Sequence, residues 1–253
     1  MTQDKDPGTV LVTGAGRRLG RIIALDLANR GWRVGVHHRA SSGEALGLVA
    51  EIEHGGGKAV ALEADLARLE ALSPLVEACA ERLGAPSCLV NNAACFEWDT
   101  LATLEGEPWQ AHLDINLRAP IFLTQAFAKA LPEGLEGNVI NLLDQKVLRP
   151  DPEHFSYTIA KAALWTATQT MAQALAPRIR VNAIAPGPVL KGLGQSQADF
   201  ERECRATLLQ HAVGAEDVTA AIRFLLDTPS ITGQIIALDG GQHLAWRNER
   251  KEG

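Results

Sequence analysis

The sequence is poor in the residues that form metal sites, disulfide frameworks and membrane spans. Its four cysteines, Cys79, Cys88, Cys95 and Cys204, include no CxxC pair and have no histidine partner at metal-ligand spacing. We therefore expect no metal, and we interpret the cysteines as small buried hydrophobes in a reducing cytoplasm. No apolar run reaches the roughly 18 residues of a membrane span, and the polar N-terminus lacks the apolar core of a signal peptide.

Clusters of basic residues are also absent. The chain has 24 Lys and Arg against 30 Asp and Glu, a net charge of −6, and no positive block of the size that nucleic-acid binding needs. We therefore expect a small-molecule substrate and neither a nucleic-acid nor a membrane partner. The length of 253 residues and the hydrophobic content of 46% suit one large α/β domain better than two small ones.

Short apolar runs alternate with helix-forming segments along the chain. The runs predict buried strands at 9–12, 32–36, 58–62, 87–90, 137–143, 179–183 and 233–238. The segments between them predict helices at 19–30, 43–54, 69–83, 107–131, 157–176 and 216–226. Residues 189–213 are the least regular segment, and we expect a mobile lid there. No linker interrupts this order, so we expect a single domain over 1–253 with flexible tails at 1–7 and 246–253.

A glycine-rich turn joins the first predicted strand to the first helix. It reads Thr13-Gly-Ala-Gly-Arg-Arg-Leu-Gly20. Backbone N–H groups at a helix N-terminus in this layout bind a diphosphate. Gly14 permits the tight turn, and Gly20 permits close packing of the helix on the strand. The turn therefore predicts a dinucleotide site.

The residues after the second strand indicate which dinucleotide is bound. An acidic residue there would bind the ribose 2′-hydroxyl of NAD, but none occurs before Glu44. Arg39 stands there instead, and Arg17 and Arg18 lie in the first turn. Three guanidinium groups suit a 2′-phosphate, which predicts NADPH, although they would also suit a solvated surface. At least one of His37–His38 is expected to cap the strand end.

A tyrosine and a lysine four residues apart, Tyr157 and Lys161, lie on one face of a predicted helix. A nearby ammonium favours the phenolate, so Tyr157 is a candidate general acid/base. Asp144 lies thirteen residues earlier, at the end of the apolar run 139–143, which would bring it to the same site. Alone, the pair is more often a surface i,i+4 contact, and the rest of the chain reverses that balance.

Four other positions have two interpretations each. Asp65, after the third strand, would accept from the adenine amino group or cap the next helix. Phe96 and Trp98, in the loop after the fourth strand, would stack on a flat substrate or pack under a lid. Asn116, on an apolar helix face, would orient a water chain or hold a local kink. The turn 186–188 is rigid and is expected beside the nicotinamide.

Taken together, the sequence resembles the short-chain dehydrogenase/reductase family over roughly residues 8–245. The resemblance depends on motifs that occur in order: the turn 13–20, Asp65-Leu66, Asn91-Asn92-Ala93, Asn116, Tyr157 with Lys161, Pro186-Gly187, and Asp239-Gly240-Gly241. It implies a Rossmann-like, doubly wound parallel sheet of about seven strands with helices on both faces, NAD(P) binding and a homotetramer.

Two departures narrow the resemblance to the pteridine reductase and dihydromonapterin reductase subgroup. Arg18 stands where the family usually has glycine, and Asp144 stands where it usually has the catalytic serine. The subgroup shares both changes and the pair His38-Arg39, and it stacks its pterin on an aromatic residue at the place of Phe96. It often has serine at the place of Ala40, for which Ser41 would compensate.

These arguments assign three sets of residues. The expected cofactor-binding residues are Gly14, Arg17, Arg18, Leu19, His38, Arg39, Ser41, Asp65, Leu66, Asn92, Ala93, Tyr157, Lys161, Pro186 and Gly187. The expected catalytic residues are Asn116, Asp144, Tyr157 and Lys161. The expected substrate-binding residues are Phe96, Asp144, Tyr157 and Pro188.

An aspartate in place of serine favours reduction of a C=N bond. An ionised Asp144 would repel the alkoxide that forms in ketone reduction, but it would stabilise an iminium-like nitrogen, and a protonated Asp144 would donate directly. We therefore expect an NADPH-dependent reductase that converts a dihydropterin to a tetrahydropterin, with the proton from Tyr157 and Asp144. The alternatives are a general NADPH-dependent carbonyl reductase and a catalytically idle NADPH sensor.

Overall fold

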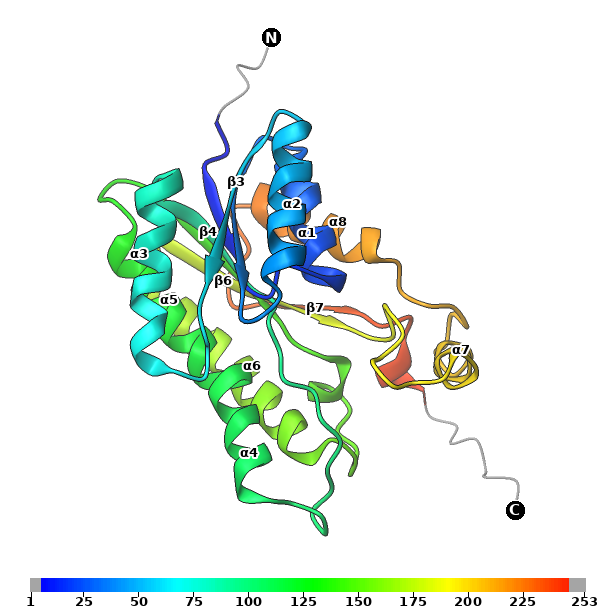
Figure 1. Cartoon of the computed structure of the whole chain (residues 1–253). Helices are drawn as coiled ribbons and strands as arrows, with labels where there is room; N and C mark the ends of the chain where they lie inside the picture. The colour runs from blue at the N-terminus through cyan, green and yellow to red at the C-terminus, as the bar shows by residue number, and fades with distance from the viewer. Residues whose placement is uncertain (1–5, 246–253) are drawn as a thin grey trace, which may run out of the picture.

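The computed structural model describes residues 6–245 (Figure 1). Seven parallel strands form one sheet in the order β3-β2-β1-β4-β5-β6-β7. The strands are β1 (Thr9–Val12), β2 (Arg33–His38), β3 (Lys58–Glu63), β4 (Pro86–Asn91), β5 (Gly137–Leu142), β6 (Ile179–Pro186) and β7 (Ile235–Leu238). The Rossmann-like sheet expected from the sequence is confirmed.

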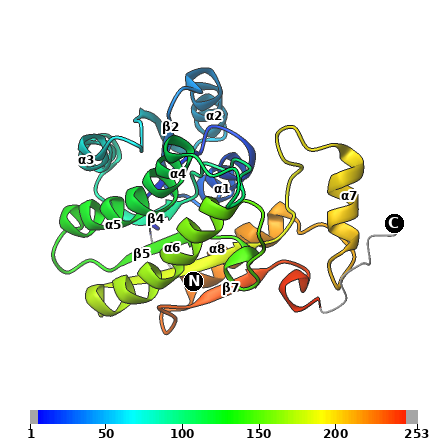
Figure 2. The ribbon, with the colours of Figure 1, turned by 90° about the horizontal axis from the view of Figure 1, so that it is seen from below.

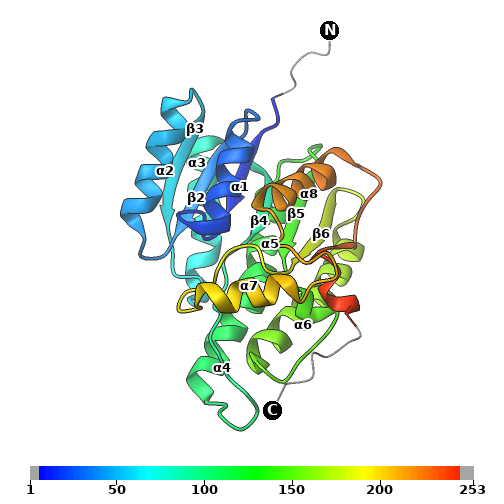
Figure 3. The same ribbon diagram turned by 90° about the vertical axis from the view of Figure 1, so that its right-hand side faces the viewer.

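Helices cover both faces of the sheet. They are α1 (Arg18–Ala28), α2 (Ser42–His54), α3 (Leu72–Leu83), α4 (Gly106–Leu113), α5 (Ala119–Ala130), α6 (Phe155–Leu175), α7 (Gln197–Arg205) and α8 (Ala215–Asp227). Short turns complete the set: η1 (Leu69–Ala71), η2 (Asp114–Arg118), η3 (Gln145–Val147) and η4 (Gln242–Leu244). Figure 3 shows α1 and α8 in front of the strands and α3 and α5 behind them. Among these helices none is long and apolar enough to cross a membrane.

The alternation of side chains along the strands divides the core into two layers. Val10 and Val12 of β1 pack with α1, α2 and α8, whereas Leu11 packs with α3 and α5 on the opposite face. Because both faces are covered, β1 and β4 each contain a continuous apolar run, 10–12 and 88–90, rather than alternating polar and apolar residues. This explains why short continuous apolar runs were sufficient to locate the strands.

The single helix predicted over 107–131 is divided into α4, η2 and α5, and η2 is a π-helical turn. Pro120 has no N–H group, so it cannot complete the α-helical hydrogen bond to the carbonyl of Asn116, four residues earlier. The wider π-helical turn at this point is a local irregularity of the kind expected when Asn116 was predicted to hold a kink.

Two other segments differ from the prediction. Residues 189–213 contain α7, a regular helix whose Ser196 cap accepts a hydrogen bond from the Asp199 backbone N–H. Figures 1 and 2 show α7 beyond the end of β6, beside η4. The second strand is also longer than predicted, and it includes His37 and His38 as buried residues.

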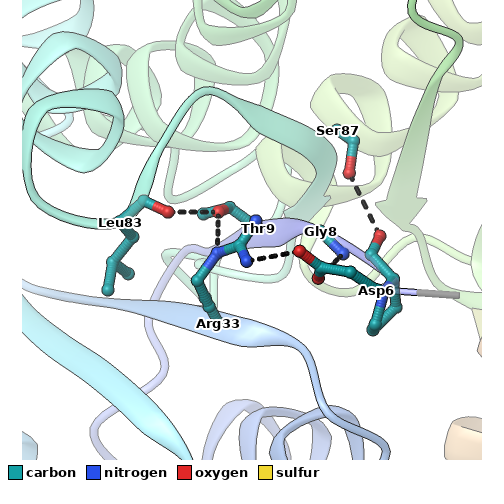
Figure 4. Close-up of polar contacts among 7 residues, drawn as sticks. Asp6, Gly8, Thr9, Arg33, Leu83 and Ser87 are labelled. Atoms are coloured by element: carbon teal, nitrogen blue, oxygen red, sulfur yellow. Dashed lines mark hydrogen bonds and ion pairs between the residues drawn. The ribbon is translucent and has the colours of Figure 1, made fainter. Parts of the chain in front are cut away.

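The predicted tails fall outside the described residues, except for Asp6 and Pro7. Asp6 is not free, because its carboxylate binds Arg33 at 2.7 Å and the Gly8 N–H at 2.9 Å. Thr9 Oγ1 donates to the Leu83 carbonyl, and Ser87 Oγ donates to the carbonyl of Pro7 (Figure 4). These contacts fix the start of the described chain to the N-terminal ends of β1, β2 and β4.

Candidate active site

The expected site residues meet where the strand order reverses. β1 lies between β2 and β4, so the connections after β1 and β4 leave the sheet in opposite directions and open a crevice at the C-terminal ends of the strands. The turn after β1, the loop after β4 and Asp144 after β5 all lie at this edge.

The glycine-rich turn is held tightly against the loop after β4. Gly14 has a φ of 63°, and a methyl group there would lie 3.1 Å from the Ala93 Cα. A methyl group on Gly20 would lie 2.3 Å from the Gly14 carbonyl oxygen. Asn92 Nδ2 donates to the Thr13 carbonyl at 2.9 Å. These positions require glycine, and they leave a backbone cradle that fits the diphosphate of a dinucleotide.

His37 supports the turn from below. Its Nδ1 accepts a hydrogen bond from the Gly14 N–H at 3.0 Å, and its Nε2 lies 3.1 Å from the Ala64 carbonyl. Only the neutral imidazole protonated on Nε2 makes both bonds. Burial accordingly lowers the pKa of His37 from 6.5 to about 4. His37 is thus the member of the histidine pair that supports the turn structurally.

The three arginines expected at the ribose 2′ position do not behave alike. All three are exposed, but Arg18 donates to the carbonyls of Leu190 and Lys191 at 3.3 and 2.8 Å. Its φ of 54° lies in the left-handed region that favours glycine, so these bonds hold an unfavourable backbone conformation. Arg18 therefore connects the turn to the segment after β6. The sequence predicted that it binds the 2′-phosphate, and it did not predict these contacts.

The remaining cofactor candidates surround the cradle. His38 is buried, and its Nδ1 has no hydrogen-bond partner within the described residues. Ser41 lies close to the glycine-rich turn, since a methyl group on Gly16 would lie 3.1 Å from Ser41 Oγ. Asp65 Oδ1 accepts from the Ala67 N–H at 3.0 Å, which closes a turn ahead of η1 and does not cap a helix, and this leaves its second oxygen available. Leu66 is part of the core layer on the α3 and α5 face of the sheet, whereas Leu19 packs against the layer on the opposite face.

The loop after β6 is fixed to β7. Gly187 donates its N–H to the Leu238 carbonyl at 2.9 Å, and a methyl group on Gly187 would lie 2.9 Å from the Asp239 Cα. Pro186 and Pro188 on either side are buried. The rigid turn expected beside the nicotinamide is therefore packed in place by the Asp239-Gly240-Gly241 segment.

Tyr157, Asp144 and Lys161 converge as the sequence predicts. The Tyr157 hydroxyl donates to Asp144 Oδ2 at 3.2 Å, and Asp144 Oδ1 accepts from the Lys146 N–H at 2.8 Å. Lys161 Nζ donates to the Leu142 carbonyl at 2.6 Å and lies 5.7 Å from the centre of the Tyr157 ring. Tyr157 and Lys161 are both buried.

The electrostatics of this group differ from the expectation in one respect. We expected Lys161 to lower the pKa of Tyr157, but burial and the adjacent Asp144 raise that pKa well above 10.0. Burial also raises the pKa of Asp144 and lowers that of Lys161 to about 8. The phenol therefore keeps its proton at neutral pH, which suits a proton donor in a reduction.

Asn116 projects from η2, and both ends of its side-chain amide form hydrogen bonds with the backbone of the loop after β4. Its Oδ1 accepts from the Cys95 N–H at 2.9 Å, and its Nδ2 donates to the Cys95 carbonyl at 2.8 Å. This two-point contact fixes the loop after β4 immediately before Phe96. The amide that the sequence placed on an apolar face thus finds its partners in the backbone of that loop.

Phe96 lies at the mouth of the site. It is 52% exposed and packs edge-on against Tyr157, with ring centres 4.7 Å apart. It also stacks on His154, at 4.3 Å and 7° between ring planes. His154 was missed from the sequence, because a histidine at the start of a helix has no pattern that distinguishes it. Trp98, which is 60% exposed, lies on the same loop.

A buried cluster of Asp99, His112 and Ser156 beside Tyr157 was also missed. The one available signal was the spacing of His112 and Asn116, four residues apart and therefore on one helix face. Within residues 6–245 no group of His, Cys, Asp and Glu could hold a metal, and the four cysteines are free.

A diphosphate cradle at the crevice of a parallel sheet, with a buried Tyr–Lys pair beside it, defines a nucleotide-dependent oxidoreductase. The comparisons agree with this class. The chain matches the family model described as enoyl-(acyl carrier protein) reductase over residues 14–243. It therefore belongs to the short-chain dehydrogenase/reductase family, whose members use NAD(P)H.

The similar proteins with assigned names have more than one activity. A 3-oxoacyl-[acyl-carrier-protein] reductase of Synechocystis sp. is 34% identical over 235 residues, which cover 91% of this chain and 95% of that protein. The crystal structure of the FolM alternative dihydrofolate reductase 1 of Brucella canis, complexed with NADP, is 43% identical, covers 97% of this chain and 98% of that chain, and has a TM-score of 0.93. A short-chain dehydrogenase of Burkholderia cenocepacia in complex with NADP is 34% identical, covers 94% of this chain and 98% of that chain, and has a TM-score of 0.88.

Proposed function

We propose that the chain is an NADPH-dependent reductase of a dihydropterin, which it converts to the tetrahydropterin by reducing a ring C=N bond. The observation that carries this proposal is the hydrogen bond from Tyr157 to Asp144. When bound, NADPH supplies the hydride. Tyr157 donates the proton to the ring nitrogen, and Asp144 orients the phenol and stabilises the positive charge that develops on that nitrogen.

The electrostatics of Asp144 support a C=N rather than a C=O substrate. A carboxylate beside the reacting atom opposes negative charge on oxygen, by several kcal/mol at an effective dielectric of about 20. It favours positive charge on nitrogen by a similar amount. Burial raises the pKa of Asp144, so its protonated form is more accessible than that of an ordinary carboxyl group, and in that form the carboxyl group donates a hydrogen bond itself.

The aromatic surface at the mouth of the site supports a flat heterocyclic substrate. Phe96 presents its ring beside Tyr157, and it already stacks on the planar imidazole of His154 in a nearly parallel arrangement. A pterin ring has the same planar, nitrogen-rich character. The similarity to the FolM alternative dihydrofolate reductase 1 of Brucella canis supports the same substrate class.

The preference for NADPH over NADH is part of the proposal. Arg17 and Arg39 are exposed and their guanidinium groups make no hydrogen bond or ion pair with other described residues, so both side chains are available to a 2′-phosphate. The site has no acidic residue after β2 that would select NAD. The complexes of the two similar structures with NADP agree with this preference.

The proposal is tested by following NADPH oxidation with purified protein. The substrates are a 7,8-dihydropterin, dihydrofolate, a 3-oxoacyl thioester and a set of ketones and quinones, each with NADPH and with NADH. We expect turnover of the dihydropterin with NADPH. Turnover of ketones or thioesters alone would leave the oxidoreductase class intact and would overturn the pterin assignment.

The second candidate is a general NADPH-dependent carbonyl reductase. The names of relatives favour it, because the Synechocystis sp. protein and one from Staphylococcus epidermidis, 30% identical over 241 residues, are both 3-oxoacyl reductases. Asp144 is the observation against it. A third candidate, an idle NADPH sensor, would not need the buried Tyr157 and Lys161, and tight NADPH binding without turnover would favour it.

We also propose that the protein is a cytoplasmic homotetramer. Free cysteines suit a reducing compartment, and burial raises the pKa of Cys79 and Cys88 to about 12, so neither thiol is reactive. β7 is an edge strand whose residues are all partly exposed, and Phe224 beside it is 51% exposed, which suits a subunit contact. Light scattering of the purified protein tests the assembly.

A further inference from the structure

Asp99, His112 and Ser156 form a buried polar cluster that the proposed reaction does not use. Ser156 Oγ lies 2.5 Å from Asp99 Oδ2 and 2.6 Å from His112 Nδ1. The three residues come from the loop after β4, from α4 and from α6. Each is buried, so every bond in the cluster is protected from water.

The direction of each hydrogen bond follows from the partners. His112 Nε2 accepts from the Glu97 N–H at 3.1 Å, so the ring proton is on Nδ1 and is donated to Ser156 Oγ. The Ser156 hydroxyl proton is then directed to the Asp99 carboxylate. This series of hydrogen bonds excludes Ser156 as a nucleophile, because His112 donates to the Ser156 hydroxyl and cannot remove its proton.

The cluster also caps helix α6. The Asp99 carboxylate accepts from the Ser156 N–H at 3.2 Å, and the Asp99 carbonyl accepts from the Phe155 N–H at 3.3 Å. The cap residue of α6 itself, His154, makes no side-chain capping bond. Asp99 therefore supplies the negative charge at the N-terminus of the helix that begins just before Tyr157.

The loop after β4 is anchored at every second residue. Asn116 binds both backbone groups of Cys95, His112 binds the N–H of Glu97, and Ser156 binds Asp99. The residues between these anchors, Phe96 and Trp98, are 52% and 60% exposed. Alternate residues of an extended segment face opposite sides, so anchoring 95, 97 and 99 directs 96 and 98 toward the open side.

We propose that Asp99, His112 and Ser156 are positioning residues that hold Phe96 against Tyr157 and so set the affinity of the enzyme for its substrate. The proposal rests on the proposed function only in taking Phe96 as the surface that the substrate contacts. Asn116 provides the anchor before Phe96, and the cluster provides the two anchors after it. The same Asp99 that ends this loop caps the helix of Tyr157 through the Ser156 backbone N–H, a bond that does not need the Ser156 hydroxyl.

Removal of the Ser156 hydroxyl would leave the His112 Nδ1–H and the Asp99 carboxylate without their shared partner inside the protein. Burying unpaired groups is unfavourable, so the loop should leave this arrangement and Phe96 should lose its fixed position. We expect Ser156→Ala to raise the KM for the dihydropterin about 10-fold, with kcat and the Kd of NADPH nearly unchanged.

The test compares Ser156→Ala, Phe96→Ala and the double variant by steady-state kinetics. If Ser156 acts through Phe96, its replacement has no further effect on KM once Phe96 is removed. Thr124→Val is the matched control, because the Thr124 hydroxyl is equally buried and donates to the Pro120 carbonyl on α5, away from the loop. Additive effects of the two substitutions on KM would overturn the proposal.

Amide hydrogen exchange of residues 95–99 provides a readout that needs no substrate. We expect faster exchange of this segment in Ser156→Ala, and also in Asp99→Asn should Ser156→Ala fail to fold, with no change in Thr124→Val. Unchanged exchange would overturn the positioning role. Faster exchange in a protein that reduces no dihydropterin would support the positioning role and would reject only the proposed function.

Discussion

The Tyr157 hydroxyl donates a hydrogen bond to Asp144 Oδ2 at 3.2 Å. The burial of the ring and the adjacent carboxylate together raise the pKa of Tyr157 well above its ordinary value. A phenol in this state keeps its proton at neutral pH, so Tyr157 has a proton to donate to the ring nitrogen during hydride transfer.

The pKa of Tyr157 can be measured directly, because Tyr157 is the only tyrosine in the sequence. We expect almost no phenolate absorbance at pH 10.0, where an ordinary tyrosine is half ionised. Asp144→Asn should lower the pKa, because it removes the nearby negative charge. Asp151→Asn, in the same connection but exposed, serves as the control and should leave the titration unchanged. A phenol that titrates at or below the ordinary value in the wild-type protein would contradict the arrangement.

Replacement of Arg17 or Arg39 should weaken NADPH binding selectively. Each guanidinium group would make charge-assisted hydrogen bonds to a 2′-phosphate, so each change to alanine should raise the Kd of NADPH at least about 10-fold. The Kd of NADH should not change. Arg21→Ala is the control, since Arg21 lies partly exposed on α1 but is paired with Glu51. Equal losses for both cofactors would contradict selection of the 2′-phosphate.

His37 should make the protein less stable in mild acid. Its pKa is about 4 in the folded chain and about 6.5 when unfolded, so acid protonates the unfolded state first. The stability contributed by neutral His37 is complete above pH 6.5 and falls as the pH decreases toward 4. The loss at pH 5 is about 2 kcal/mol.

Urea denaturation at pH 7.5 and pH 5 measures this loss. His37→Asn should flatten the pH dependence, at the cost of lower stability at pH 7.5, whereas His54→Gln, at an exposed position, should retain it. If the pH dependence is the same in His37→Asn and in the wild-type protein, His37 is not the buried neutral group.

The strands and the family were predictable because their signals are local. Apolar runs such as 9–12 are bounded by turn residues, and the family motifs are short segments at fixed places in that order. The convergence of Asp144 with Tyr157 was predictable for a similar reason, since the end of one strand and the start of the next helix meet at the same edge of the sheet.

The features that were missed depend on charge pairing or on long-range contacts. α7 has few apolar residues, and pairs such as Arg202 with Asp199 support it, so no apolar run marked it in the sequence. The contact between Asp99 and Ser156 joins residues 57 positions apart, and His112 lies 44 positions from Ser156. No local pattern specifies such a meeting.

The raised pKa of Tyr157 was missed because it depends on the burial of the ring and on the relative distances of the charged groups. The sequence shows a lysine one helical turn from the tyrosine, but it does not show that Asp144 lies closer to the hydroxyl than Lys161 does. In the fold, Lys161 is engaged with the Leu142 carbonyl and Asp144 accepts directly from the phenol. The nearer, negative group has the larger effect.

The central claim, that Asp144 adapts a short-chain dehydrogenase/reductase to a C=N bond, is tested most directly by Asp144→Ser. Steady-state kinetics are measured with NADPH and a 7,8-dihydropterin, and NADPH binding is measured by fluorescence as a check on folding. We predict that the wild-type protein reduces the dihydropterin and that Asp144→Ser lowers kcat/KM about 100-fold or more, with the Kd of NADPH unchanged. Dihydropterin turnover that survives the substitution unchanged would contradict the role of Asp144.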